Sequence, residues 1–121
     1  MVVKFKGGNL MELSYYKKED ALIIDFVGEL DHHSSEEIRA KVDDIIDREQ
    51  SKKVILDFYN VTFMDSSGIG AIVGRYKNVK RKGGTLCIIN LRKGVQKVFE
   101  IAGLYKVIET YEDLEEALRA I

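Results

Sequence analysis

Cysteine and histidine are scarce in this chain of 121 residues, and their scarcity excludes several kinds of site. The only cysteine, Cys87, has no partner within the chain, so no internal disulfide can form, and we expect a buried, unreactive thiol. A structural zinc site typically takes about four cysteine, histidine or carboxylate ligands. Besides this cysteine the chain has only two adjacent histidines, His32 and His33, and we expect no metal.

The chain also lacks an excess of charge and any long apolar run. It has 19 lysines and arginines against 20 aspartates and glutamates, so its formal net charge is −1. The chain therefore has no excess of positive charge that would attract nucleic acid or an anionic membrane. No apolar run approaches the roughly 18 residues of a membrane span, and the start lacks the apolar centre of a signal peptide. We therefore expect a cytoplasmic protein that binds neither nucleic acid nor membrane.

Short apolar segments rich in β-branched residues alternate with segments whose apolar residues recur at helical spacing. The order β-β-α-β-α-β-α-β-α is typical of an α/β domain with right-handed crossovers. We expect a single domain, with a mixed and mostly parallel sheet of about five strands and about four helices. The expected strands span residues 11–16, 21–28, 53–58, 85–89 and 107–109.

Residues 1–10 stand apart from this pattern, because residues 7–9 break it and Met11 is a second methionine. Val2, Val3 and Phe5 either add a strand or belong to a mobile leader. We favour the leader, which assigns the domain to residues 11–121.

Local spacing also predicts where two of the helices begin. Ser34 has capping-box spacing with Glu37, and Asn90 follows an expected strand directly. We expect Ser34 and Asn90 to cap the helices that follow them.

The most informative segment is residues 63–70, with the sequence F-M-D-S-S-G-I-G, between an expected strand and an expected helix. A helix start has free backbone N–H groups and a partial positive charge, which suit a serine that carries phosphate. Alternatively, Asp65, Ser66 or Ser67 merely caps the helix, although two serines allow both roles. The position of Ser66 at the carboxyl end of a strand agrees with a functional site, because open α/β sheets place their sites there.

Known enzyme motifs fail at this segment. No lysine follows a glycine as a phosphate-binding P-loop requires. A nucleophile elbow needs a glycine two residues before its serine, but Met64 and Asp65 stand at those places before Ser66 and Ser67. Gly68, Gly70 and Gly74 are spaced one residue too widely for a dinucleotide fingerprint, and we expect Gly70 and Gly74 to allow close packing of helix on sheet. Although His32 is a conceivable base for Ser66, we expect Ser66 to be modified or contacted, and not to act as a nucleophile.

The chain resembles the STAS domains of bacterial anti-sigma-factor antagonists. The resemblance covers residues 11–121 and rests on residues 28–33 (G-E-L-D-H-H), residues 56–58 with 63–70, and residues 74–77 (G-R-Y-K). It implies a partner-switching protein that is not an enzyme. In its unphosphorylated form, such a protein binds an anti-sigma factor that is also a serine kinase, and so frees the sigma factor.

The resemblance further implies that the kinase uses ATP and magnesium to phosphorylate the serine directly after the motif aspartate, here Ser66. A dedicated serine phosphatase reverses the modification, and the antagonist itself needs no cofactor. Asp31, Asp65, Ser67 and Gly68 are implied as residues that bind the partner. An alternative is a STAS module of a scaffold or sensor complex, in which Ser66 is regulatory but the partner is no anti-sigma factor.

Overall fold

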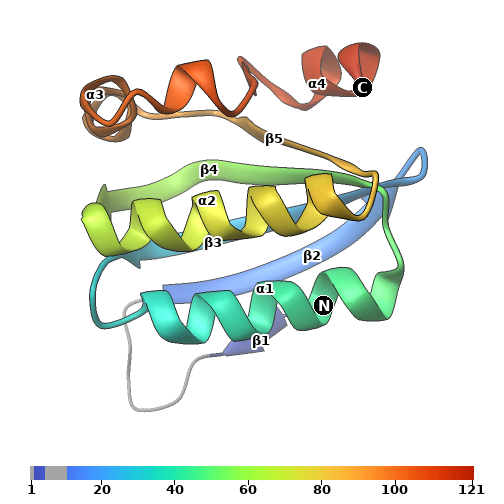
Figure 1. Ribbon diagram of the computed structural model, residues 1–121, viewed down its shortest axis with the longest axis horizontal. Coiled ribbons are helices and arrows are strands. Elements are labelled where there is room, and N and C mark those ends of the chain that lie inside the picture. The colour runs from blue at the N-terminus through green and yellow to red at the C-terminus, as the bar shows by residue number, and fades with distance from the viewer. Residues whose placement is uncertain (1, 5–10) are drawn as a thin grey trace.

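The computed structural model describes residues 2–4 and 11–121. Strands and helices alternate from β3 onward, as the sequence predicted (Figure 1). The strands are β1 (Val2–Lys4), β2 (Met11–Lys18), β3 (Ala21–Leu30), β4 (Lys53–Met64), β5 (Thr85–Ile89) and β6 (Thr110–Tyr111). The helices are α1 (Ser35–Glu49), α2 (Ser66–Arg81), α3 (Lys93–Ile101) and α4 (Leu114–Ala120), with a 3₁₀ turn at Leu104–Lys106.

The described strands form one sheet of six, in the order β1-β2-β3-β4-β5-β6. β1, β2 and β3 pair antiparallel, whereas β3, β4, β5 and β6 pair parallel. The predicted fold class, a mixed and mostly parallel α/β sheet, is therefore confirmed. Residues 2–4 form β1, which is the strand alternative and not the leader that we favoured, while residues 1 and 5–10 lie outside the described residues.

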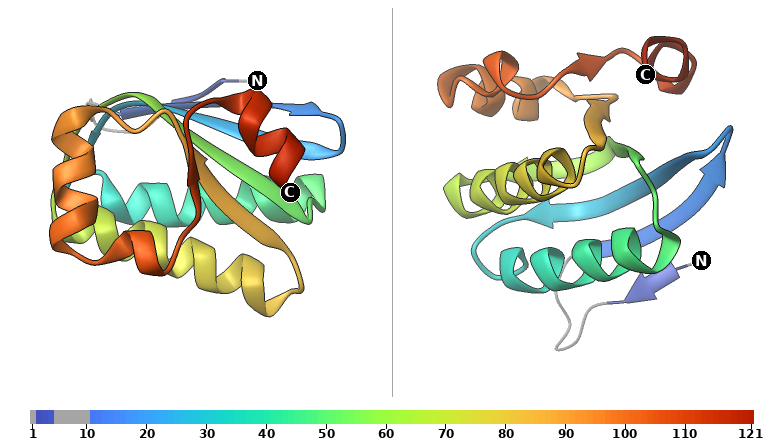
Figure 2. Two further views of the ribbon diagram at one scale, coloured as in Figure 1. Left: turned by 90° about the horizontal axis from the view of Figure 1, so that it is seen from above. Right: turned by 45° about the vertical axis from the view of Figure 1, so that its right-hand side comes forward.

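Helices α1 and α2 run side by side over one face of the sheet, and α4 lies away from them beyond β5 (Figure 2). The periodicity of α1 explains its orientation, because its apolar residues recur on one face and that face is buried in the main core. On the opposite face of the sheet, Ala117 of α4 packs in a smaller cluster with residues of β3, β4 and β5. The buried apolar residues of α1 are Ile38, Val42, Ile45 and Ile46.

The last strand lies further along the chain than predicted. Residues 107–109 were expected to form it, but β6 is Thr110–Tyr111, which pairs with Ile88 and Ile89 of β5. Within the expected segment only Ile108 is buried, while Val107 is exposed. Ile108 therefore anchors the connection after the 3₁₀ turn, and pairing with β5 decides where the strand forms.

The predicted cap at Asn90 is also wrong. Asn90 has a positive φ of 60°, and its side-chain amide donates to Oδ1 of Asp57 at 3.0 Å. The residue before the first turn of α3 is Arg92, whose side chain makes no capping hydrogen bond. Asn90 thus joins the end of β5 to the middle of β4 instead of starting a helix. Among the described helices, none has the length and hydrophobicity needed to cross a lipid bilayer.

Candidate functional site

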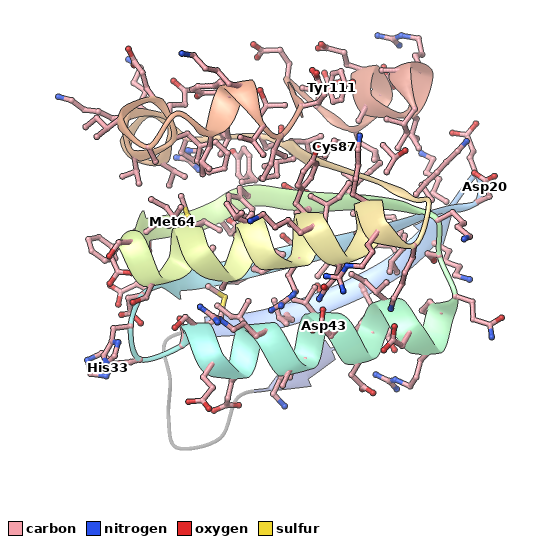
Figure 3. The ribbon with its side chains drawn as sticks, in the orientation of Figure 1. Asp20, His33, Asp43, Met64, Cys87 and Tyr111 are labelled. Atoms are coloured by element: carbon pink, nitrogen blue, oxygen red, sulfur yellow. The ribbon has the colours of Figure 1, made fainter. Side chains whose placement is uncertain are left out.

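The ends of β3 and β4 meet at the edge of the sheet where α1 and α2 begin. Leu30 and Met64 are paired in register, and the N–H of Asp65 donates to the carbonyl oxygen of Leu30 at 3.2 Å. Met64 and His33 are labelled at this same end of the molecule in Figure 3. The structure therefore brings together the two motif segments that the sequence singled out, residues 28–33 and 63–70.

Asp65 caps helix α2. Its Oδ1 accepts hydrogen bonds from the N–H groups of Ser67 at 2.9 Å and Gly68 at 3.1 Å. Its Oδ2 accepts from the N–H of His32 at 3.1 Å, so the same carboxylate also holds the loop after β3. The sequence left open which of three side chains caps the helix, and the structure assigns that role to Asp65. Neither serine is needed as the cap.

Ser66 is the first residue of α2 and is exposed, whereas Ser67 is half-buried. Among the described residues, no group forms a hydrogen bond with the Ser66 hydroxyl. The hydroxyl lies at the start of α2, where the helix dipole is positive. Ser66 is therefore accessible to a modifying enzyme, and its position favours an added negative charge.

Gly68 is buried beneath the end of β3. A Cβ built on Gly68 would overlap the carbonyl oxygen of Leu30 and would lie 2.9 Å from Cγ of Met64. The close packing that was predicted for Gly70 and Gly74 is therefore found at Gly68. A Cβ on Gly74 would meet nothing within 4 Å. Gly68, which the resemblance implied as a partner-binding residue, thus packs against Leu30 and Met64 and sets how closely α2 approaches the sheet.

Asp31 and Ser34 organise the loop before α1. Oδ1 of Asp31 accepts from the N–H of Ser34 at 3.0 Å, and Oγ of Ser34 accepts from the N–H of Asp31 at 3.1 Å. These reciprocal bonds form a capping box one turn earlier than predicted, because Ser34 makes no capping bond of its own toward Glu37. Oδ1 of Asp31 also accepts from the N–H of His33 at 2.9 Å.

The two histidines of this loop are exposed, with ring centroids 5.8 Å apart. Their side chains project from a loop whose backbone is held by Asp31 and Asp65. In the described part of the chain, no three histidine, cysteine or acidic side chains gather where they could hold a metal ion.

An ion pair that was not predicted from the sequence joins the two helices that flank the site. Arg75 of α2 is only 8% exposed, and its Nε lies 2.8 Å from Oδ1 of Asp43 of α1. Burial lowers the pKa of Arg75, Asp43 raises it, and the positive charge of Arg39 lowers it again. The available signal was the position of Arg75 on the apolar face of α2, between Ile72 and Val79.

A second missed feature is a pair of aspartates on the other face of the sheet. Asp25 and Asp57 are register partners on β3 and β4. Oδ1 of Asp57 accepts from Tyr59 N and Asn90 Nδ2, whereas Oδ1 of Asp25 is buried without a hydrogen-bond partner in the described residues. Burial, and then the charge of Asp57, raise the pKa of Asp25.

Comparison with known proteins identifies relatives of the whole domain. The model of the STAS domain family matches residues 12–117. The anti-sigma F factor antagonist of Paenibacillus polymyxa is 39% identical over 97 residues, which span 80% of this chain and 83% of that protein.

Solved structures agree with this match. The anti-sigma factor antagonist SpoIIAA in its unphosphorylated form has a TM-score of 0.73 at 33% identity, over 90% of this chain and 97% of that chain. The Bacillus cell fate determinant SpoIIAA in the phosphorylated form has a TM-score of 0.66 at 30% identity, over 90% of this chain and 99% of that chain. The motif residues also resemble those of this antagonist, stage II sporulation protein AA.

Proposed function

The chain belongs to the STAS domain family, among its anti-sigma factor antagonists, and on that premise we propose a partner switch controlled at Ser66. The unphosphorylated protein binds an anti-sigma factor that is also a serine kinase, and the sigma factor is released. The kinase then phosphorylates Ser66 with ATP and magnesium, which ends the interaction, and a serine phosphatase restores it. The protein acts in the cytoplasm as a regulator without a cofactor or catalytic activity of its own.

The exposed hydroxyl of Ser66 carries this proposal. Asp65 supplies the cap of α2, so Ser66 can be modified without the loss of a hydrogen bond that holds the helix. Ser67 follows it in α2, and Asp31 and the two histidines lie in the loop that Asp65 joins to the start of this helix, where a kinase would approach. The solved phosphorylated form of the related SpoIIAA supports a phosphate within this family.

The energetics favour a switch that acts at the interface with the partner. A phosphoserine adds roughly 1.5 to 2 negative charges, which a helix start favours by only about 0.3–1 kcal/mol. A thousandfold loss of partner affinity needs about 4 kcal/mol. Desolvation of the phosphate and repulsion from acidic partner groups can supply that amount, and Asp65 adds to the local negative charge. Amide spectra of the two forms should therefore match away from the start of α2.

The proposal is tested with a cognate anti-sigma kinase and ATP, followed by measurement of the mass of the protein. We expect one added phosphate on the wild type and none on Ser66→Ala, while the matched control Ser67→Ala is still modified. Ser66→Ala should bind the kinase persistently, and Ser66→Asp should bind poorly. Equal binding by these two variants would contradict the switch. A phosphate on Ser66 without binding to any anti-sigma factor would favour the scaffold or sensor module instead.

A further inference from the structure

The guanidinium of Arg39 lies beside the first turns of α2. A Cβ built on Gly70 would stand 3.4 Å from Nη2 of Arg39, so the side chain of Arg39 crosses from α1 to the surface of α2. Gly70 follows Ser66 by one helical turn. Both helices begin at the same edge of the sheet, with α1 next to α2 (Figure 1). The cation therefore reaches the end of α2 that carries the serine.

Arg39 has no carboxylate to neutralise it among the described residues. It is exposed, and none of the ion pairs in the described part of the chain includes it. Its charged neighbour Arg75 is already paired with Asp43 and repels it. Of these two neighbouring guanidinium groups, only that of Arg75 is paired with a carboxylate. The excess of positive charge lies at Arg39, which is the more exposed of the two.

We infer that Arg39 is the internal counter-ion of a phosphate on Ser66, an inference that rests on the proposed modification of that serine. Residues four apart on a helix have Cβ atoms about 5–6 Å from each other, so Ser66 and the Gly70 position are neighbours on one face. Helical side chains lean toward the helix N-terminus, which carries Arg39 toward the same end as Ser66. A phosphate on Ser66 would extend into the space next to Nη2 of Arg39.

The residue types fit this role. Guanidinium binds phosphate oxygens through parallel N–H groups, and a pair of this kind is stronger than a neutral hydrogen bond. Gly70 leaves the path between Arg39 and Ser66 open, since any side chain at position 70 would contact the guanidinium. Phosphorylation would then change the surface twice, by adding an anion at Ser66 and by withdrawing the cation of Arg39 from solvent and from a partner.

The test measures the second pKa of the phosphate by phosphorus NMR. Phosphoserine is incorporated at position 66 during translation, so the result does not depend on any kinase. The groups that can influence the phosphate are Arg39 and Arg75 with Asp43 from the helices, and the acidic and histidine side chains of the two loops. Each variant changes only one arginine, so all the other groups stay the same. The loop groups are Asp31, His32, His33 and Asp65.

Arg39→Gln should raise the second pKa of the phosphate by about half a unit, since it removes a partly exposed ion pair. Arg48→Gln is the matched control, because it removes the same charge from the far end of α1, where Arg48 pairs with Asp44 at 3.1 Å. Arg39→Lys should give an intermediate value. Equal pKa values for Arg39→Gln and Arg48→Gln would overturn the inference. If no kinase modified the wild-type protein, the proposed function would be contradicted. The titration would still decide whether Arg39 contacts a phosphate at position 66, because it does not depend on a kinase.

Discussion

The carboxylate of Asp65 accepts a hydrogen bond from the backbone N–H of His32 at 3.1 Å, and so joins the loop after β3 to the first turn of α2. Its other oxygen caps the helix through the N–H groups of Ser67 and Gly68. One side chain therefore fixes both segments of the candidate site, and it leaves the hydroxyl of Ser66 uncommitted.

Asp65→Ala should lower the free energy of unfolding by about 1–2 kcal/mol, because the cap and the bond to the neighbouring loop are lost together. Asp65→Asn keeps one acceptor oxygen and should lose less. Urea denaturation followed by circular dichroism measures both. A variant Asp65→Ala that is as stable as the wild type would show that the cap contributes little.

Gly68→Ala should lower the free energy of unfolding by about 1–3 kcal/mol, because the new methyl group has to displace α2 from Leu30 and Met64. Gly74→Ala is the matched control on the same helix, with nothing within 4 Å of the new Cβ. It should raise stability by roughly 0.5–1 kcal/mol, because alanine is the better helix former. Thermal unfolding of the two variants should move in opposite directions, and a shift in the same direction would be inconsistent with this packing.

Asp25→Asn should make the protein more stable at neutral pH. Burial, followed by the charge of Asp57, raises the pKa of Asp25 above its ordinary value of 3.8. The folded protein therefore keeps a proton that the unfolded chain has lost, and stability falls as pH rises from that value through the folded pKa.

This loss should be absent in Asp25→Asn, with a gain of up to about 0.5 kcal/mol at neutral pH for a group that solvent partly screens. Below the ordinary pKa of the carboxyl, the difference from the wild type should vanish. Urea titrations at several pH values measure it, with Asp44→Asn as an exposed control for the loss of one charge. A constant difference at all pH values would rule out the titration of Asp25 as its cause.

Cys87 should resist alkylation in the folded protein. The residue is fully buried, and burial, with a further contribution from Glu109, raises the pKa of its thiol to about 12. At about pH 8.5, where an ordinary cysteine is half ionised, native Cys87 should remain unlabelled by iodoacetamide, while the unfolded chain reacts. Ser66→Cys supplies an internal comparison, because its exposed thiol should be labelled at once. Mass measurement after proteolysis distinguishes the two positions.

Elements that depend on nearby residues were predictable from the sequence. The β2–β3 hairpin, the buried face of α1 and the junction before Ser66 follow from local apolar spacing and from polar residues at the ends of elements. Such features need no knowledge of which distant segment lies alongside. For the same reason, the sequence located Ser66 at the carboxyl edge of a strand without any coordinates.

Features set by distant partners were not predictable in this way. Spacing alone predicts a helix cap at Asn90, yet its amide bonds to Asp57, which lies 33 positions away. The need for glycine at position 68 comes from Leu30 on another strand. The position of β6 follows from its pairing with β5, and not from the apolar pair just before it. In each case tertiary contacts decided among locally acceptable alternatives.

Because Asp65 caps the helix, the residue that stabilises the fold differs from Ser66, the residue that we propose carries the signal. If one residue both capped α2 and carried the phosphate, each modification would remove the cap and destabilise the start of the helix. Under the proposed switch, phosphate would be added to Ser66 and removed again many times on the same molecule, and the cell would not have to make or refold a new one for each round.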